Sequence, residues 1–221
     1  MPTAGRHEFI RGAVACFLAQ DYPDTELVIL DDGAQPVEAL LPADSRIRYY
    51  RELPKQTTGN KRNRCCELSS GDVIVHFDDD DWSAPGRIRH QLETLMADAS
   101  KRVTGFNLLL FWDVRSECGY RYRLHDRYAL GTSQMYFRSW WEQNRFSSRQ
   151  LGEDSDFAFR AKRAGVIVVE DGAQWLVARI HDGRTSTTEP NTTQFLPEGR
   201  ASFPEEFFAC ASTSSPTSPT A

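Results

Sequence analysis

The segment Val73-Ile74-Val75-His76-Phe77-Asp78-Asp79-Asp80-Asp81-Trp82 places four consecutive aspartates directly after an apolar run. The apolar run predicts a buried strand, and the aspartates begin where that strand ends. Neighbouring carboxylates repel one another, so the cluster costs stability unless a cation, alone or with a phosphate ligand, shares the charge. Oxygen ligands without a thiolate cluster favour Mg²⁺ or Mn²⁺ over zinc. The segment therefore predicts a metal site at a strand end, and the alternative is a solvated acidic loop.

The first half of the chain alternates between expected strands and helices. Helical or strand patterns predict helices over 6–20, 60–68 and 85–97, and strands over 26–30, 46–50 and 73–77. This alternation predicts an α/β fold with a mixed, mainly parallel sheet flanked by helices. Ligands bind outside the carboxyl ends of the strands in such sheets. We therefore expect Asp31 and Asp32, which end one strand, to lie near the aspartates that begin at Asp78, and nucleotide chemistry becomes the leading hypothesis.

The second half of the chain has a more mixed pattern. It predicts strands over 103–112, 120–124, 166–170 and 175–180, and helices over 139–143 and 153–164. We expect residues 1–208 to form one domain and residues 209–221, rich in Ser, Thr and Pro, to be a disordered tail.

Composition excludes several classes of protein. The chain has 221 residues, with 26 basic and 31 acidic side chains and a formal charge of -5, which argues against a nucleic-acid-binding protein. The cysteines include no CxxC pair, so neither a disulfide framework nor a zinc site is indicated. The sequence shows neither a membrane-spanning stretch nor a signal peptide, and we expect a cytoplasmic protein. Association with a membrane is expected to be peripheral, through a lipid-linked acceptor.

Taken in order, the motifs resemble those of the family 2 glycosyltransferases, which have the GT-A fold. The resemblance covers nearly the whole chain and rests on Met1-Pro2-Thr3, Glu26-Leu27-Val28-Ile29-Leu30-Asp31-Asp32-Gly33, Gly59-Asn60-Lys61-Arg62-Asn63, His76 to Trp82, Gly152-Glu153-Asp154 and Arg179-Ile180-His181. It implies a hexosyltransferase-like enzyme that moves a sugar from a nucleotide-diphosphate sugar to the hydroxyl of a saccharide or other acceptor. The implied mechanism is inverting and depends on Mn²⁺ or Mg²⁺.

The resemblance also implies where the sugar nucleotide binds. Thr3 and Asp31 are expected near the nucleobase and ribose, with Asp32 as a further candidate for that pocket. Lys61 is a candidate phosphate contact, because an ammonium is a compact point charge, and the alternative is that it belongs to an exposed helix face. The flanking Arg62 and Arg64 are expected either to do the same or to face solvent.

The aspartate run matches the DxD motif of these enzymes. Asp78 and Asp79 are expected to contact the sugar nucleotide, and Asp80 is expected to bind the metal. Asp81 is a candidate for orienting the water ligands of that metal. We expect the adjacent Trp82 to pack in the core.

The acceptor side rests on Gly152-Glu153-Asp154. Asp154 matches the general base of inverting members, and Glu153 is a candidate for binding acceptor hydroxyls; the alternative for both is to favour the start of a helix. His181 matches a histidine that contacts metal or phosphate in some relatives, and the alternative is a structural imidazole. Trp140, Trp141 and the stretch 131–133 resemble the region that shapes the acceptor pocket, with Trp141 as a candidate for stacking on an acceptor sugar; the alternative for these aromatic residues is to pack in the core.

One departure from the family pattern concerns the first strand. Relatives have several apolar residues before Pro-Thr, so two explanations are open: the strand is truncated here, with fewer hydrogen bonds beside the nucleobase pocket, or the true start codon lies upstream. Two further hypotheses follow. A sugar-phosphate nucleotidyltransferase needs a glycine-rich basic loop, of which Thr3-Ala4-Gly5-Arg6 is a fragment. A truncated GT-A domain without catalytic activity is the other.

Overall fold

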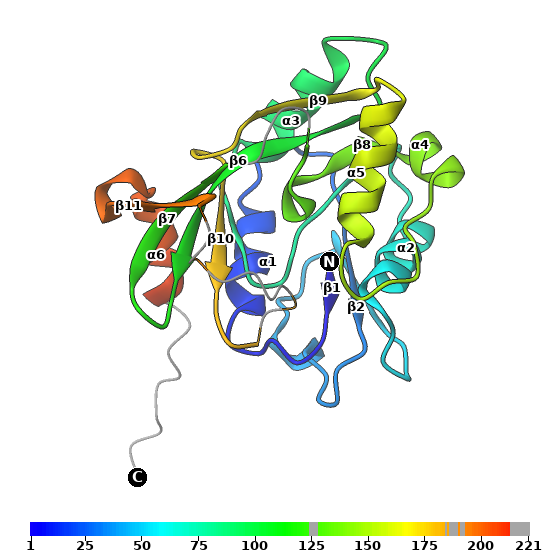
Figure 1. Ribbon diagram of the computed structural model, residues 1–221. Coiled ribbons are helices and arrows are strands. Elements are labelled where there is room, and N and C mark those ends of the chain that lie inside the picture. The colour runs from blue at the N-terminus through cyan, green and yellow to red at the C-terminus, as the bar shows by residue number, and fades with distance from the viewer. Residues whose placement is uncertain (124–127, 184, 186–189, 191–192, 213–221) are drawn as a thin grey trace.

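The computed structural model describes residues 1–123, 128–183, 185, 190 and 193–212, and its strands form two sheets with helices packed against them (Figure 1). The first sheet has the order β1-β2-β3, and both of its strand pairs are parallel. Its strands span Pro2–Thr3, Leu27–Asp31 and Ile47–Arg51. Every residue of β2 is buried, as expected for an apolar strand with a neighbour on each side.

The second sheet is built around the long strand β6, Val103–Asp113. Parallel pairing joins β6 to β9 (Ile167–Asp171) and β10 (Leu176–Ile180). Antiparallel pairing joins it to β7 (Cys118–Arg123) and β8 (Met135–Phe137). Three shorter strands are attached at the periphery, namely β4 (Val73–Val75), β5 (Trp82–Ser83) and β11 (Phe195–Glu198). The α/β class with a mixed sheet is thus confirmed.

Helices pack against the strands of both sheets. They are α1 (Ile10–Leu18), α2 (Thr58–Leu68), α3 (Arg87–Met96), α4 (Arg138–Gln143), α5 (Glu153–Arg163) and α6 (Glu205–Ser212), with 3-10 turns η1 (Glu38–Leu40), η2 (Gly131–Ser133) and η3 (Arg200–Ser202). Helix α2 packs on β1 and β2, α3 on β6 and β8, and α5 on β9 and η2. Helices α2 and α5 also contact each other.

Local sequence fixes two of these helix starts. Thr57 caps α2, because its hydroxyl oxygen accepts the backbone N–H of Asn60 at 3.3 Å. Gly152 precedes α5 with φ of 79°, a left-handed conformation that glycine adopts at little cost. As a result, Glu153 and Asp154 occupy the first turn of α5.

The main hydrophobic core lies between α1, α3 and the strands. The apolar face predicted for α1 is buried, with Ile10, Ala13, Val14 and Phe17 all 2% exposed or less. Trp82, which is 4% exposed, belongs to the same cluster, so the expected core packing of Trp82 is confirmed.

Four elements were not predicted from the sequence. Strands β5 and β8 are too short to show a period of two, and β11 contains Pro197, which argues against a strand away from a sheet edge. Helix α6 runs to Ser212, so residues 209–212 of the expected tail are helical. Residues 213–221 and Leu124 of the expected strand 120–124 lie outside the described residues.

The two sheets are not joined to each other by strand pairing among the described residues. Strand β1 pairs with β2, and β4 pairs with β8. Between β2 and β4 lies a cavity of about 700 Å³, here called the inter-sheet slot, lined by Met1, Val28, Val73, Val75 and neighbouring residues. At one end of it the Met1 amine donates to the Val28 carbonyl oxygen at 2.8 Å.

Among the described residues, no helix has the length and apolar character needed to cross a membrane.

Candidate active site

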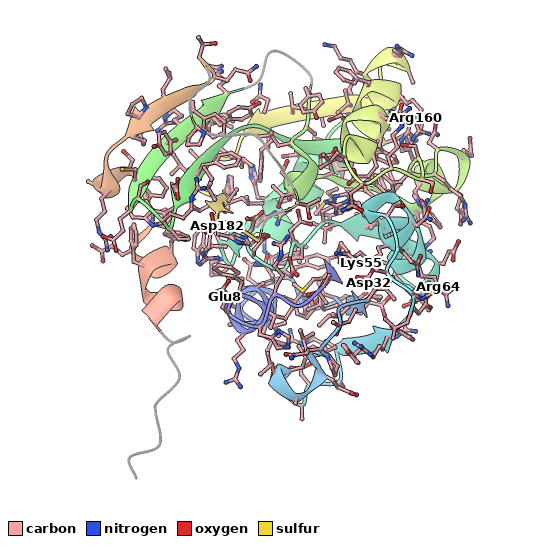
Figure 2. The ribbon with its side chains drawn as sticks, turned by 60° about the horizontal axis from the view of Figure 1, so that its bottom comes forward. Glu8, Asp32, Lys55, Arg64, Arg160 and Asp182 are labelled. Carbon is pink, nitrogen blue, oxygen red and sulfur yellow. The ribbon has the colours of Figure 1, made fainter. Side chains whose placement is uncertain are left out.

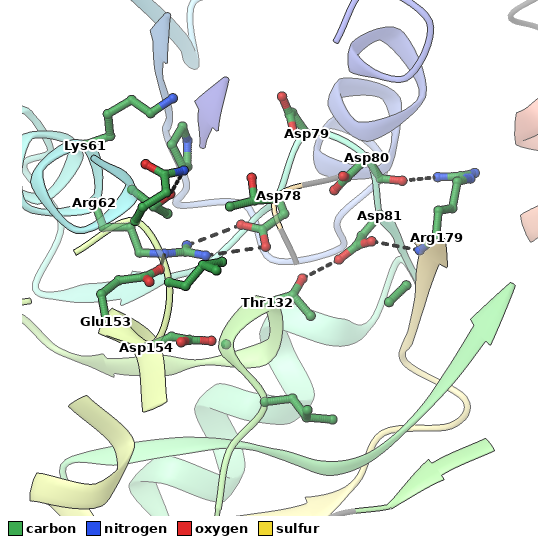
Figure 3. A pocket seen from close by; sticks show the side chains of 18 of the residues that line it. Lys61, Arg62, Asp78, Asp79, Asp80, Asp81, Thr132, Glu153, Asp154 and Arg179 are labelled. Atoms are coloured by element: carbon green, nitrogen blue, oxygen red, sulfur yellow. Dashed lines mark hydrogen bonds and ion pairs between the residues drawn. The ribbon is translucent and has the colours of Figure 1, made fainter. Parts of the chain in front are cut away.

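A second cavity, of about 560 Å³, lies at the carboxyl ends of the strands and is here called the site cavity. It is formed by the loop after β1, the start of α2, the segment after β4, turn η2, the start of α5 and the end of β10. Figure 2 turns this side of the molecule forward and shows the exposed Lys55, which also lines the cavity. The charged residues that line it include Arg6, Lys61, Arg62, Asp78, Asp79, Asp80, Asp81, Glu153, Asp154 and Arg179 (Figure 3).

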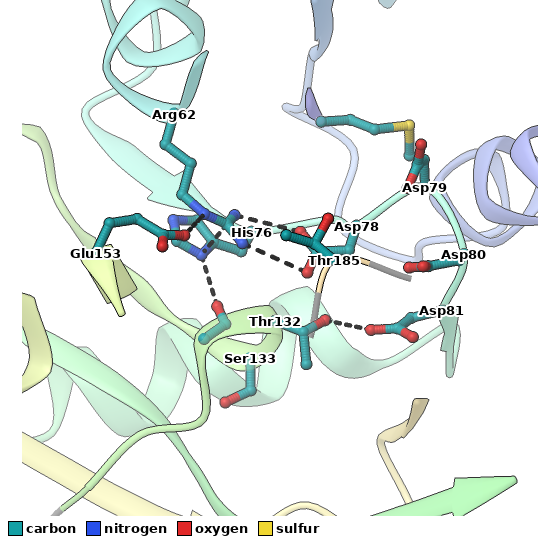
Figure 4. A network of polar contacts seen from close by, with 12 residues as sticks. Arg62, His76, Asp78, Asp79, Asp80, Asp81, Thr132, Ser133, Glu153 and Thr185 are labelled. Atoms are coloured by element: carbon teal, nitrogen blue, oxygen red, sulfur yellow. Dashed lines mark hydrogen bonds and ion pairs between the residues drawn. The ribbon is translucent and has the colours of Figure 1, made fainter. Parts of the chain in front are cut away.

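Arg62 links the aspartate run to the start of α5 (Figure 4). Its Nε donates to Glu153 Oε1 at 3.2 Å, and its Nη1 donates to Asp78 Oδ1 at 3.2 Å. Burial works to raise the pKa of Asp78, but the charge and hydrogen bond of Arg62, together with other neighbouring groups, outweigh it, and this pKa is lowered to about 2. Burial raises the pKa of Glu153 despite the same guanidinium. One buried cation thus holds two carboxylates on opposite sides of the cavity.

His76 supports this network from beneath. Its Nδ1 lies 2.6 Å from the carbonyl oxygen of Gly131, and its Nε2 lies 3.1 Å from the Tyr136 hydroxyl. Burial, together with the nearby Arg62, lowers the pKa of His76 well below its usual value, so the imidazole is neutral. A neutral ring that donates through Nδ1 to Gly131 accepts at Nε2 from Tyr136. His76 therefore fixes the position of η2 relative to the aspartate run.

Asp80 and His181 are brought together by the end of β10. The Asp80 Oδ2 atom lies 3.0 Å from His181 Nε2, and both side chains are buried. Arg6 joins them: its Nη1 contacts Asp80 Oδ2, lies 3.3 Å from His181 Nε2 and lies 3.5 Å from Asp79 Oδ1. Burial raises the pKa of Asp79, although the Arg6 charge opposes that shift.

Asp81 faces the other way along the segment, toward η2 and β10. Its Oδ1 accepts the backbone N–H of Arg179 at 3.0 Å, and its Oδ2 accepts the hydroxyl of Thr132. Burial, and then the charge of Asp78, raise the pKa of Asp81 to about 6. Arg179 in turn donates through Nη1 to the Asp80 carbonyl oxygen at 2.6 Å. These bonds fix the backbone of the aspartate run against β10.

Asp154 lies beside Gly131 without room between them. A Cβ on Gly131 would come 1.9 Å from Asp154 Oδ2. The observed position of the Asp154 carboxylate therefore requires a glycine at residue 131. Asp154 Oδ1 accepts the backbone N–H of Ser155 at 2.7 Å. Glu153 and Asp154 both line the site cavity, opposite the aspartate run (Figure 3).

Lys61 lies on the β1 side of the cavity. Its Nζ donates to Asp32 Oδ1 at 2.8 Å and to the Thr3 carbonyl oxygen at 3.1 Å. Thr3, Lys61, Asp78 and Asp79 line the cavity, as their predicted roles require, and those roles stay predictions.

Asp31 and Asp32 are placed differently from the expectation. Neither is among the residues that line the site cavity. Asp31 is fully buried, and its carboxylate accepts the N–H groups of Gly33 at 2.8 Å and Val37 at 3.0 Å and the Tyr49 hydroxyl at 2.8 Å. Asp32 accepts the N–H of Gln56 at 2.7 Å as well as Lys61. Both carboxylates hold turns in the structure, because a buried anion needs several donors.

The predicted stacking of Trp141 on an acceptor sugar is wrong in this structure. The side chain is 2% exposed in a cluster with Phe146 and Phe157, and its Nε1 donates to Asn63 Oδ1 at 3.0 Å. It therefore packs in the core below α2. Arg64 takes its solvent-facing alternative, with its side chain 40% exposed beside Glu52.

Sequence reasoning missed several residues of the cavity wall, among them Arg6, Lys55 and Gln56. Arg6 was included in the helix expected over 6–20 and in a loop fragment, but α1 begins only at Ile10, so Arg6 lies in the loop before it; Lys55 and Gln56 lie in the Pro-containing connection before α2. A loop carries no period, so the direction of these side chains could not be inferred. A basic residue next to a glycine after the first strand was the one available signal.

The side chains present fit an Mg²⁺ or Mn²⁺ ion that keeps other ligands. Asp80 and His181 offer one carboxylate oxygen and one imidazole nitrogen at a single point. Among the described His, Cys, Asp and Glu side chains, no group of three or more converges on such a point. Mg²⁺ in particular is usually held by one or two protein carboxylates, water and substrate phosphates. The donor set suits that arrangement and not an all-protein cage.

Solved structures share this fold. A crystal structure of S. aureus TarS 1-349 in complex with UDP aligns with a TM-score of 0.64 at 16% identity, covering 81% of this chain and 59% of that chain. Mannosyltransferase PcManGT from Pyrobaculum calidifontis, in complex with GDP-Man and Mn²⁺, aligns with a TM-score of 0.63 at 15% identity, covering 81% of this chain and 55% of that one. The fold is therefore that of the GT-A glycosyltransferases.

Sequence comparison gives the family. The model described as Glycosyl transferase family 2 matches residues 1–164, and the chain belongs to that family. The putative colanic acid biosynthesis glycosyl transferase WcaA of Escherichia coli is 32% identical over 93 residues, 40% of this chain and 33% of that protein. The putative glycosyltransferase EpsE of Bacillus subtilis is 31% identical over 106 residues, 45% of this chain and 38% of that protein. The chain thus matches well under half the length of these curated relatives.

Proposed function

We propose that this chain transfers a sugar from a nucleotide-diphosphate sugar to an acceptor hydroxyl, with inversion and with a divalent cation. The observation that carries the proposal is the site cavity itself, which brings Asp80, with His181 in contact behind it, into one space with Glu153 and Asp154. The family to which the chain belongs supports a glycosyl donor. Solved neighbours contain UDP or GDP-Man with Mn²⁺, which supports a sugar nucleotide and a metal here.

The aspartate side of the cavity is proposed to receive the diphosphate. Asp80 and His181 would hold the cation, which would stabilise the leaving diphosphate as its negative charge grows. Lys61 is proposed as the phosphate contact from α2, where its ammonium is held 2.8 Å from Asp32 Oδ1. Thr3 and Asp79 line the same side and are proposed to contact the nucleoside.

The α5 side of the cavity is proposed to activate the acceptor. Asp154 would take the proton of the attacking hydroxyl, as a positioned carboxylate does in general base catalysis. Glu153 would accept a hydrogen bond from a second acceptor hydroxyl, with its own carboxylate oriented by Arg62. Attack from the α5 side on a sugar whose diphosphate leaves toward Asp80 inverts the anomeric centre.

Calorimetry with UDP and GDP, with and without Mn²⁺, tests the donor half of the proposal. We expect Asp80→Asn to weaken nucleotide binding in Mn²⁺ and to have little effect without it. Asp182→Asn is the matched control, because its side chain is 88% exposed. Failure of both nucleotides to bind at millimolar concentration would refute the proposal. A screen of sugar nucleotides that measures released nucleoside diphosphate then identifies the donor.

A further inference from the structure

We propose that Arg6 is a built-in counter-cation of the metal site, which a divalent ion must displace before it can bind Asp80 and His181. The inference rests on the proposed function in one respect, the use of Asp80 as a metal ligand. It assigns a role to a residue that forms no part of the DxD segment.

The position of the guanidinium carries the inference. Arg6 Nη1 contacts Asp80 Oδ2 and lies 3.3 Å from His181 Nε2, so one nitrogen meets both atoms that would bind the ion. The same nitrogen lies 3.5 Å from Asp79 Oδ1. A cation bound by Asp80 and His181 would occupy nearly the same volume. Arg6 and a divalent ion cannot both be there.

The loop after β1 holds Arg6 in this place. Gly5 has φ of 76°, which turns the chain, and the Arg6 carbonyl oxygen accepts the N–H groups of Phe9 at 3.1 Å and Ile10 at 3.0 Å. The backbone of Arg6 is thereby fixed to the start of α1. Beyond these Nη1 contacts, the bond that the described residues add is one from Nη2 to the exposed Thr185 hydroxyl at 3.3 Å, and an exposed bond of this kind is given up at little cost when the side chain moves.

The charge of the surroundings explains why an arginine is kept here. Asp79 and Asp80 are adjacent carboxylates, 5% and 8% exposed, and their repulsion in a partly buried site costs stability without a counter-charge. A guanidinium is always charged and presents several donors in one plane. When a sugar nucleotide arrives with its metal, its diphosphate offers Arg6 a new anionic partner. Metal and nucleotide would therefore bind cooperatively, beyond their direct contact.

Binding of Mn²⁺ without nucleotide tests this role directly. Calorimetry would compare the wild type with Arg6→Met, and Arg11→Met on the exposed surface of α1 is the matched control. We expect Arg6→Met to bind Mn²⁺ roughly tenfold or more tightly than the wild type, because a unit charge at contact distance no longer competes. Arg11→Met should match the wild type. Equal or weaker binding by a folded Arg6→Met overturns the proposal.

Two further measurements keep the test decisive. The melting temperature of Arg6→Met should be lower than that of the wild type without metal, and Mn²⁺ should raise it by a larger increment. The factor by which UDP tightens Mn²⁺ binding should be smaller in Arg6→Met. In this variant there is no displaced guanidinium to form an ion pair with the diphosphate. If Arg6→Met does not fold, Arg6→Gln replaces it with the same expectations.

The outcomes separate this inference from the proposed function. If Mn²⁺ binds wild type and Arg6→Met equally well, and Asp80→Asn abolishes that binding, the role of Arg6 is wrong and the metal site stands. If Mn²⁺ binds none of the proteins, even with UDP present, both the role of Arg6 and the metal dependence are refuted.

Discussion

The site cavity and the inter-sheet slot lie on either side of β1, and they are lined by different kinds of residues. The site cavity is lined by many charged side chains, several of them paired with one another, such as Arg62 with Glu153. The slot is lined by strand residues, among them Val28, Val73 and Val75. One cavity is shaped by side chains at strand ends, and the other by two strands that lack pairing with each other. The first holds the charged groups that the proposed chemistry needs, whereas the second is a hollow between two strands that do not pair.

The largest effect should follow from removing the proposed base in the site cavity. We expect Asp154→Asn to lower the rate of sugar transfer by roughly 10²- to 10⁴-fold, because a positioned base contributes that much. Nucleotide affinity should be unchanged, since Asp154 lies on the α5 side. Asp156→Asn, in the same helical turn and paired with Arg160 at 3.3 Å, is the control and should keep its activity. Steady-state assays of both variants make the comparison, and an active Asp154→Asn would remove the acceptor half of the proposal.

A single methyl group on η2 should have the next largest effect. Gly131→Ala would place a Cβ 1.9 Å from Asp154 Oδ2, so the carboxylate must move. A displacement of about 1 Å can cost roughly 10²-fold in rate. Gly199→Ala has no atom within 4 Å of the new Cβ and serves as the control. If Gly131→Ala turns over like Gly199→Ala, the position of Asp154 does not limit the reaction.

The inter-sheet slot can be tested by filling it. We expect an N-terminal extension of four alternating apolar and polar residues to pair with β2 in continuation of the β1 register. Burial of two apolar side chains should stabilise the fold by about 3 kcal/mol and raise the melting temperature by roughly 6–12 °C. A Gly-Ser extension of the same length is the control. Equal melting of the two fusions would mean that the slot is not a strand position.

The smallest expected effect concerns Glu26 at the mouth of the slot. Burial works to raise its pKa, but bonds from Arg48 at 2.7 Å and from the Ser70 hydroxyl at 2.7 Å lower it to about 2. A lowered folded-state pKa stabilises the fold at pH above 4.5, and this contribution is lost as the pH falls toward 2. We expect Glu26→Gln to cost about 1 kcal/mol at pH 7, after allowance for solvent screening.

Urea unfolding at several pH values measures this cost. The stabilities of the wild type and Glu26→Gln should converge as the pH approaches 2. Glu38→Gln, on η1 and outside both cavities, controls for loss of charge alone. A constant difference at all pH values would show that Glu26 acts through packing and not through its charge.

Sequence patterns predicted those elements whose side chains repeat. The apolar face of α1, the strands β2 and β6 and the start of α5 after Gly152 were all anticipated, because each has a regular period or a marked terminus. The aspartate run was expected in the cavity and lies there. Family membership was also anticipated from the motifs and is confirmed.

The sequence did not predict which way several side chains point or which groups they contact. Trp141 was a candidate for stacking on a sugar, but its Nε1 donates a hydrogen bond to Asn63 and its ring packs in the core. Asp31 ends a strand as expected, yet the following turn supplies enough N–H donors to hold its carboxylate. Arg6 lies in a loop, where no repeat tells which way a side chain points. The contacts of Trp141 and Arg6 join segments distant in the chain, which a single sequence does not relate.

The guanidinium of Arg62 has a consequence for how this fold can diversify. It holds Asp78 and Glu153 at once, so two walls of the cavity share a single buried cation. A substitution that removes either carboxylate would leave only the other one to balance the charge of Arg62. New substrate preferences on this scaffold should therefore arise by paired replacements across the cavity, and a lineage that loses one carboxylate should soon lose or replace the arginine.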